Sequence, residues 1–149
     1  MIVNIREAIE TDIPKLCTLL AILFEKEAEF SANIQLQQVG LQAIISNKQI
    51  GKIYVIQEDD TIVGMVSLLF SISTALGGKV AWLEDMIIAH EAQNKGYGSR
   101  LIKYTIDEAK RLACKRITLL SDADNDAAHR FYSRFGFEYS LMQPLRLIL

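Results

Sequence analysis

The spacing of apolar residues predicts a strand followed by two helices in the first third of the chain. Apolar and polar residues alternate over residues 2–8, which is the period of a half-buried strand. From residue 13 to about Phe30, apolar residues recur at steps of three and four, which predicts an amphipathic helix with Pro14 in its first turn. A weaker helical pattern covers residues 36–44.

The middle of the chain has the period and composition of strands. Residues 52–58 and 61–71 are two β-rich runs separated by two aspartates, which is the spacing of a hairpin. The second run is almost wholly apolar, so we expect it at the centre of a sheet and covered on both faces. A pair of glycines then leads into a further predicted strand over residues 79–89, which contains two carboxylates.

The last third is predicted to contain two helices and three short strands. They are a helix at 98–113, a strand at 116–120, a helix from 124 or 125 to about 135, and strands at 137–140 and 143–149. The chain has no repeat, linker or low-complexity stretch, so residues 1–149 are expected to form one mixed α/β domain.

Composition narrows the class of protein. Half of the 149 residues are apolar, 23% are charged and the formal net charge is -2, which is unlike the concentrated basic surface of a nucleic-acid-binding protein. No apolar run reaches the roughly 18 residues of a membrane span, and the first residues lack the pattern of a signal peptide. A soluble, cytoplasmic protein with no membrane partner is therefore expected. Two cysteines, interpreted as buried thiols, and two histidines do not suggest a metal site.

A glycine-containing loop at residues 93–99 follows a predicted strand and opens a predicted helix. Backbone N–H groups and the positive end of that helix converge there, which favours an anion such as a diphosphate. A Walker A loop requires Lys-Ser/Thr after its second glycine, and Ser99-Arg100 does not supply it. A dinucleotide fingerprint requires a small residue where this chain has Leu101.

A third pattern, Gln/Arg-x-x-Gly-x-Gly/Ala, fits the loop, and a second segment strengthens it. Residues 125–137 read Asn-x-x-Ala-x-x-Phe-Tyr-x-x-x-Gly-Phe, which places Asn125, Ala128 and Tyr132 on one helix face. Alone, Asn125 is equally explained as a helix cap. Together, the two segments resemble the GCN5-related N-acetyltransferase (GNAT) superfamily, with the specific resemblance running from about Trp82 to Phe137.

The resemblance implies a single-domain fold with a mixed, mostly antiparallel sheet of six to seven strands and about four helices. Its fourth and fifth strands splay apart to hold acyl-CoA, with acetyl-CoA as the acyl donor and no metal. The residues that the resemblance assigns to coenzyme A are Met86, Ile87, Ile88, Gln93, Asn94, Lys95, Gly96, Tyr97, Gly98, Ser99, Asn125, Ala128 and Tyr132. Lys95 or Arg100 is also expected to balance phosphate charge.

Transfer of an acetyl group to an amine requires a base and an acid. A lysine-type amine has a pKa of about 10.4, so it must lose a proton before it attacks a thioester. Tyr132 is the predicted acid, by resemblance, for the departing thiolate. Glu84 is the predicted base because it interrupts an apolar strand, where a carboxylate needs a partner or a wet cleft. An ion pair is the alternative explanation for Glu84, and Asp85 or water alone are alternative bases.

The sequence does not identify the amine acceptor, which the family's range leaves as a small amine, a polyamine or a peptide or protein amine. Glu25, Glu27 and Glu29 are either a solvated helix end or a surface that attracts a cationic amine. A non-catalytic acyl-CoA sensor or regulatory module is the alternative function, but it would require neither Glu84 nor Tyr132. The apolar C-terminal residues suggest an edge strand that pairs across a homodimer.

Overall fold

Five strands form one sheet in a computed structural model that describes residues 1–26 and 32–149. In sheet order they are β1 (Val3–Glu7), β2 (Gly51–Glu58), β3 (Thr61–Ser73), β4 (Gly78–Ile88) and β5 (Ile117–Leu119). All neighbouring strands are antiparallel except β4 and β5, which are parallel. The mixed, mostly antiparallel sheet confirms the predicted fold class.

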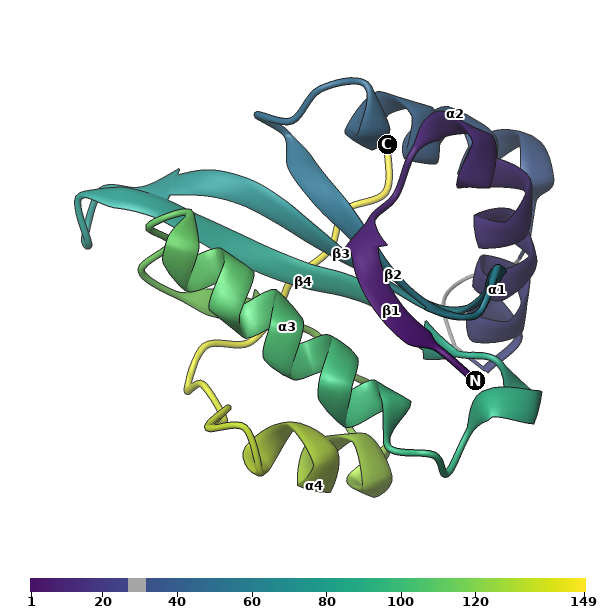
Figure 1. Ribbon diagram of the computed structural model, residues 1–149. Coiled ribbons are helices and arrows are strands. Elements are labelled where there is room, and N and C mark those ends of the chain that lie inside the picture. The colour runs from purple at the N-terminus through teal and green to yellow at the C-terminus, as the bar shows by residue number, and fades with distance from the viewer. Residues whose placement is uncertain (27–31) are drawn as a thin grey trace.

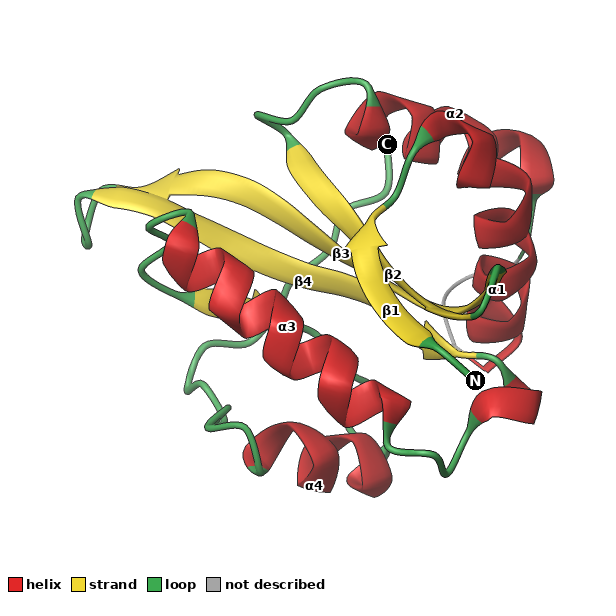
Figure 2. Ribbon diagram, in the orientation of Figure 1, coloured by secondary structure: helices red, strands yellow, loops and turns green. Residues whose placement is uncertain are grey.

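Four α-helices cover the two faces of the sheet (Figure 1). They are α1 (Ile13–Lys26), α2 (Ile34–Ile45), α3 (Tyr97–Arg111) and α4 (Asp126–Ser133). The helices α1 and α2 lie against one face, and α3 crosses the other with α4 beside it (Figure 2). The first helix was predicted to reach about Phe30, and residues 27–31 lie outside the described residues.

Each face has its own hydrophobic core, because successive residues of a strand point to opposite sides. On β2, Ile53 and Val55 belong to the cluster beneath α1 and α2, whereas Tyr54 and Ile56 belong to the cluster beneath α3. The central strand β3 is buried on both faces from Ile62 to Leu68, as its continuous apolar run predicts.

The N-terminal end of α1 is fastened to β1 by an ion pair. The guanidinium of Arg6 donates to both carboxylate oxygens of Asp12, at 2.8 and 3.0 Å, and the backbone N–H of Ile9 donates to the same carboxylate at 2.8 Å. This arrangement lowers the pKa of Asp12, chiefly through the hydrogen bond from Arg6. Asp12 therefore joins β1 to the short helical turn Glu10–Asp12 that precedes α1.

The central part of β4 contains a β-bulge. Met65 of β3 faces Ile87 and Ser67 faces Glu84, so two residues of β4 lie opposite Val66. One of those two, Asp85, has a φ of 53°, which is a strained backbone conformation for a residue with a side chain. The bulge reverses the alternation of β4, so that Met86 and Ile88 pack towards α3 while Ile87 packs towards α1.

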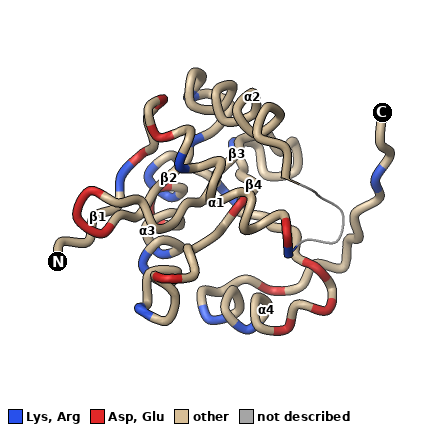
Figure 3. The backbone as a smooth tube through the Cα atoms, turned by 90° about the vertical axis from the view of Figure 1, so that its right-hand side faces the viewer, with Lys and Arg blue, Asp and Glu red and all other residues tan. Residues whose placement is uncertain are grey.

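The prediction of six to seven strands is wrong for the described residues, because neither C-terminal strand forms. After Ser140 the chain follows an extended, exposed path that leaves the body of the protein (Figure 3). Leu145 and Leu147 are 99% and 83% exposed. An alternating apolar pattern produces a strand only where another strand supplies backbone partners, and the described chain places none beside this tail.

Among the described residues, every helix is too short or too polar to cross a bilayer. Basic and acidic residues are interspersed along the chain rather than gathered on one face (Figure 3). Cys17 is buried, as expected, but Cys114 is only partly buried.

Candidate functional site

The loop between β4 and α3 has a conformation that favours anion binding. Asn94 has a φ of 64° and Gly96 a φ of 78°, so two left-handed residues turn the backbone before α3 begins. Gly96 is the N-cap residue of α3 and has no side chain to accept from the first helical N–H groups. Those N–H groups carry partial positive charge and no capping side chain, which suits a bound phosphate group.

The same loop borders a hollow of ≈ 540 Å³ between the N-terminal end of α3 and the helix α4. Its lining consists of Ile88, Ala92, Gln93, Asn94, Gly96, Tyr97, Gly98, Ser99, Asn125, Ala127, Ala128, Phe131 and Arg134. A Cβ atom on Gly98 would lie 3.6 Å from the Phe131 ring and 3.9 Å from Ile88. Gly98 therefore lies in the space between α3 and α4, where a larger side chain would project towards Phe131.

Most residues that the resemblance assigns to coenzyme A lie together around this hollow, but four do not. Met86, Ile87, Lys95 and Tyr132 are absent from its lining. Sequence reasoning also missed lining residues, namely Ala92, Ala127, Phe131 and Arg134. Arg134 is the most informative of these because it adds positive charge near the loop. It occupies a variable position of the motif, so the motif gave no reason to select it.

Asn125 caps α4 and also lines the hollow. Its side-chain oxygen accepts a hydrogen bond from the backbone N–H of Ala128 at 3.1 Å, so it caps α4. An amide side chain also has two N–H donors, and Asn125 lines the hollow. Capping fixes the side chain in place and thus orients those donors.

Beyond the short strand β5, one edge of β4 has no paired strand among the described residues. The two strands pair only at residues 81–83, although β4 continues to Ile88. The N–H of Ala89 donates to Val63 on the β3 side at 2.8 Å, so the neighbouring Ile88 directs its own N–H and C=O towards the open side. The Ile88 carbonyl accepts from the Gln93 side chain at 3.1 Å. Pairing between β4 and β5 therefore ends before Glu84, as the expected splay of these strands requires.

Tyr132 lies on α4, packed among aromatic rings. Its ring centroid is 5.1 Å from that of Phe131 and 5.6 Å from that of Phe137. Burial raises the pKa of Tyr132 to about 12, because the phenolate form is poorly solvated there. The hydroxyl therefore keeps its proton throughout the physiological pH range, which a proton donor requires.

Glu84 lies on the other face of β4. Its neighbour Leu83 is buried beneath α3, so Glu84 points to the side of α1 and α2, where it is exposed. It stands opposite Ser67, whose buried hydroxyl has no hydrogen-bond partner within the described residues. Asp85, within the bulge, is partly exposed. Glu84 thus remains accessible from this face, and Trp82, two residues before it on β4, is 38% exposed.

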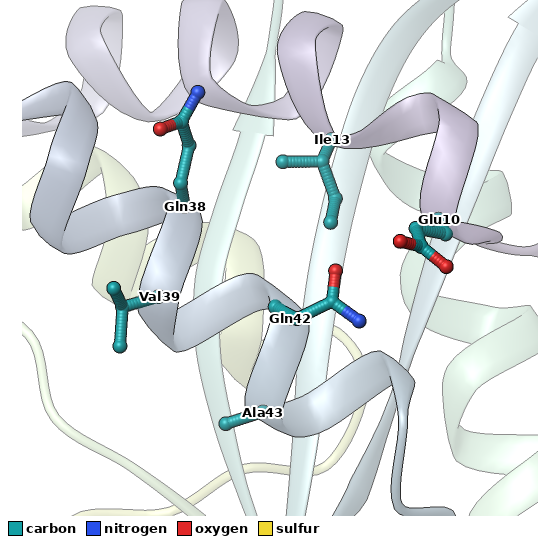
Figure 4. Close-up of a pocket in the computed structure, with 6 residues that line it drawn as sticks. All are labelled: Glu10, Ile13, Gln38, Val39, Gln42 and Ala43. Carbon is teal, nitrogen blue, oxygen red and sulfur yellow. The ribbon is translucent and has the colours of Figure 1, made fainter.

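A second hollow, of ≈ 600 Å³, lies between the start of α1 and the helix α2 (Figure 4). It is lined by Glu10, Ile13, Gln38, Val39, Gln42 and Ala43. Gln42 reaches from α2 towards the side of Ile13 and Glu10 (Figure 4). None of the residues that the sequence predicts for catalysis or cofactor binding lies there. Of the acidic run, Glu25 is exposed on α1, and Glu27 and Glu29 lie outside the described residues.

Comparison with known proteins places these features in a family. Residues 17–137 match the acetyltransferase (GNAT) family. The uncharacterised N-acetyltransferase YhfO of Bacillus subtilis (strain 168) is 27% identical over 138 residues, which are 91% of this chain and 89% of that protein. The spermine/spermidine N(1)-acetyltransferase of the same organism is 38% identical over 60 residues, 40% of each chain.

Solved structures show the same fold. The crystal structure of a possible acetyltransferase from Clostridium difficile 630 superimposes with a TM-score of 0.86 at 18% identity. The superposition covers 100% of both chains. At that identity the match supports the arrangement of helices and strands, and the site must be argued from the residues themselves.

Proposed function

The chain belongs to the acetyltransferase (GNAT) family, and from this membership and the site geometry we propose that it transfers an acetyl group from acetyl-CoA to a primary amine. The amine attacks directly while both substrates are bound. The observation that carries the proposal is the hollow between α3 and α4, whose wall combines the uncapped N–H groups of α3 with Gly98 and Asn125. The family's acetyltransferase relatives support the N-acetyltransferase activity itself.

The residues around the hollow fit an acyl-CoA donor. The loop at residues 93–99 would hold the diphosphate through backbone N–H groups, and Arg134 would add positive charge. The open edge of β4 at residues 86–88 would offer backbone groups to the amide-rich pantetheine arm. Asn125 would donate to the same arm. When bound, the donor supplies an acetyl thioester, a carbonyl carbon with a thiolate leaving group.

Two side chains on opposite sides of β4 would move the protons. Glu84, or Asp85 beside it, accepts a proton from the amine, which then forms the new C–N bond. The C–S bond breaks and the sulfur leaves with the electron pair, and Tyr132 donates its hydroxyl proton to that sulfur. The newly attached nitrogen loses its second proton, which returns to Tyr132 through solvent, and Glu84 or Asp85 releases the first proton to solvent. The products are an amide, a free thiol and one proton. The raised pKa of Tyr132 keeps the donor protonated before each turnover.

We propose that the acceptor is an amine that carries positive charge elsewhere in the molecule. One relative is a spermine/spermidine acetyltransferase, and on this chain Glu84 and Glu25 are exposed on β4 and α1. Carboxylates near an acceptor site attract cations over about 8 Å at physiological salt. Small diamines, polyamines and lysine-bearing peptides are therefore the compounds to test first.

A non-catalytic acyl-CoA-binding regulator is the second candidate, since it would use the same hollow. The position of Tyr132 against the aromatic rings of α4 and the accessible carboxylates of β4 favour the enzyme. We further propose that residues 1–149 act as one cytoplasmic domain, and that the exposed C-terminal tail pairs with a second copy as a homodimer.

A thiol-release assay with acetyl-CoA and a panel of amines tests the proposed activity. Release of free thiol that depends on one class of amine would support catalysis. Binding of CoA without thiol release across the panel would favour the regulator. Stabilisation by NAD but not by CoA, measured as a shift in the unfolding temperature, would exclude both.

A further inference from the structure

Glu58, the last residue of β2, contacts the predicted diphosphate loop from outside the hollow. Its Oε2 accepts a hydrogen bond from Tyr97 Oη at 2.5 Å and an ion pair from Lys95 Nζ at 3.0 Å. The Lys95 ammonium also lies 5.9 Å from the centre of the Tyr97 ring. One carboxylate thus fastens two loop residues to a strand 37 and 39 positions earlier in the sequence.

The Lys95 side chain contacts Glu58 and does not line the hollow, so this contact is distinct from phosphate binding. Asn94 and Gly96, on either side of it, line the hollow, whereas Lys95 does not. Two left-handed residues flank Lys95, and its ammonium pairs with Glu58 at 3.0 Å. In this structure Lys95 therefore anchors the loop to β2 through Glu58.

Tyr97 fixes the other end of the contact. It is the first residue of α3, its ring is 7% exposed within the core cluster beneath α3, and its hydroxyl reaches Glu58. Both interactions stabilise the ionised carboxylate, so they lower the pKa of Glu58, with the Tyr97 hydrogen bond as the larger cause. Because α3 begins without a capping side chain, contacts such as these are what tie its first residue to the rest of the protein.

We propose that Glu58 is a positioning residue that holds Lys95 and Tyr97 so that the N–H groups at the start of α3 already point into the hollow before coenzyme A binds. This inference rests on the proposed function. An anion site that is rigid before binding loses less conformational entropy when the anion arrives. Loss of Glu58 would therefore weaken binding of the diphosphate without altering the acid or the base.

Whether loss of Glu58 weakens or strengthens CoA binding shows whether the residue acts by positioning the loop or only through its negative charge. A carboxylate near a phosphate site repels the phosphate, so removing it would strengthen CoA binding if Glu58 acted only through its charge. Positioning predicts the opposite. We expect Glu58→Ala to raise the Kd for CoA and the KM for acetyl-CoA about tenfold, the equivalent of one charge-assisted hydrogen bond, with kcat unchanged at saturation.

Two further variants and a control complete the test. Glu58→Gln keeps an acceptor for Tyr97 but loses the ion pair, so its Kd should fall between those of the wild type and Glu58→Ala. Tyr97→Phe should also raise the Kd, and the double variant should bind no more weakly than Glu58→Ala, because both changes break one contact. Asp107→Asn is the matched control, since it removes one carboxylate from a Lys103 pair elsewhere on α3 and should leave the Kd unchanged.

Hydrogen exchange of the unliganded protein gives a readout that does not require CoA. Amides at residues 96–99 should exchange faster in Glu58→Ala than in the wild type, while those in the middle of α3 should not. An unchanged or lower Kd in Glu58→Ala with unchanged exchange would overturn this inference alone. Failure of the wild-type protein to bind CoA would overturn the proposed function and this inference with it.

Discussion

The two sides of β4 differ in how their sites are built. On the side of α3 and α4, the hollow is lined by two continuous segments, residues 93–99 and residues 125–134, with few contributors from elsewhere. On the side of α1 and α2, Glu84 of β4 and Ser67 of β3 are register partners on neighbouring strands. The first site is local in sequence, and the second depends on the register of the sheet.

This difference follows from what each side has to bind. A diphosphate is recognised by backbone N–H groups, which require only a turn, a glycine and a helix start, and these have sequence signatures. An amine acceptor is recognised by side chains that different strands and helices bring together. We call the side of α3 and α4 the cofactor side and the side of α1 and α2 the acceptor side. The predictions below, in order of decreasing effect, test whether the two sides can be altered separately.

Replacing Tyr132 should have the largest effect because it is the predicted proton donor. Tyr132→Phe keeps the ring packed against Phe131 and Phe137, yet it should lower kcat by about 100-fold or more, the usual contribution of general acid catalysis. Thiol release at saturating substrates measures this. Tyr139→Phe is the control, since that exposed hydroxyl contacts His129 at 2.8 Å. Equal rates for Tyr132→Phe and the wild type would remove the acid role.

A larger side chain in the hollow between α3 and α4 should weaken CoA binding and leave the acceptor side unchanged. Gly98→Val places methyl groups in the space before Phe131, and we expect the Kd for CoA to rise by about 30- to 100-fold, the equivalent of 2–3 kcal/mol. Gly98→Ala is the matched control, because its Cβ would make only ordinary contacts at 3.6 Å. Calorimetric titration measures both. Equal affinity in the valine variant would mean that CoA does not pass between α3 and α4.

The acceptor side is tested by the pH dependence of the rate. If Glu84 is the base, it must be ionised, so kcat/KM should fall at acidic pH in the wild type, and Glu84→Gln should be about tenfold or more slower without that acidic limb. Asp85→Asn should then retain the limb. The opposite pattern would assign the base to Asp85. Because the pKa of Tyr132 is about 12, its ionisation should cause no loss of activity below about pH 10.

Stability on the side of α1 and α2 should depend on the ion pair between Arg6 and Asp12, for which the sequence carries no motif. Asp12→Asn removes the ionised partner of Arg6 at the start of α1, and it should lower the free energy of unfolding by about 2 kcal/mol at pH 7. The folded pKa of Asp12 is lowered, so its contribution is present above pH 3.8 and is lost as pH falls through that lowered pKa. The two proteins should therefore converge in urea unfolding at low pH. If the difference in free energy of unfolding between the two proteins stayed constant as pH fell, the ionised carboxylate of Asp12 would not be the cause of that difference.

Particular residues show which parts of the protein were predictable from sequence. The hairpin, the approximate bounds of α3 and the start of α4 followed from short-range turn and helix signals. The bulge at Asp85 had no such signal, because it arises from the count of residues on two paired strands. The contact of Glu58 with Tyr97 joins residues far apart in the sequence. The C-terminal tail had the right period for strands but no neighbouring strand to pair with.

The central claim is that the N–H groups at the start of α3 bind the diphosphate of coenzyme A. Titration of the ¹⁵N-labelled protein with CoA, followed by backbone amide NMR, tests it directly. The account predicts that the amides of residues 96–99 show the largest downfield shifts, and that pantetheine, which lacks the diphosphate, leaves them nearly unchanged. Saturable CoA binding that left these amides unshifted, or equal shifts with pantetheine, would contradict it.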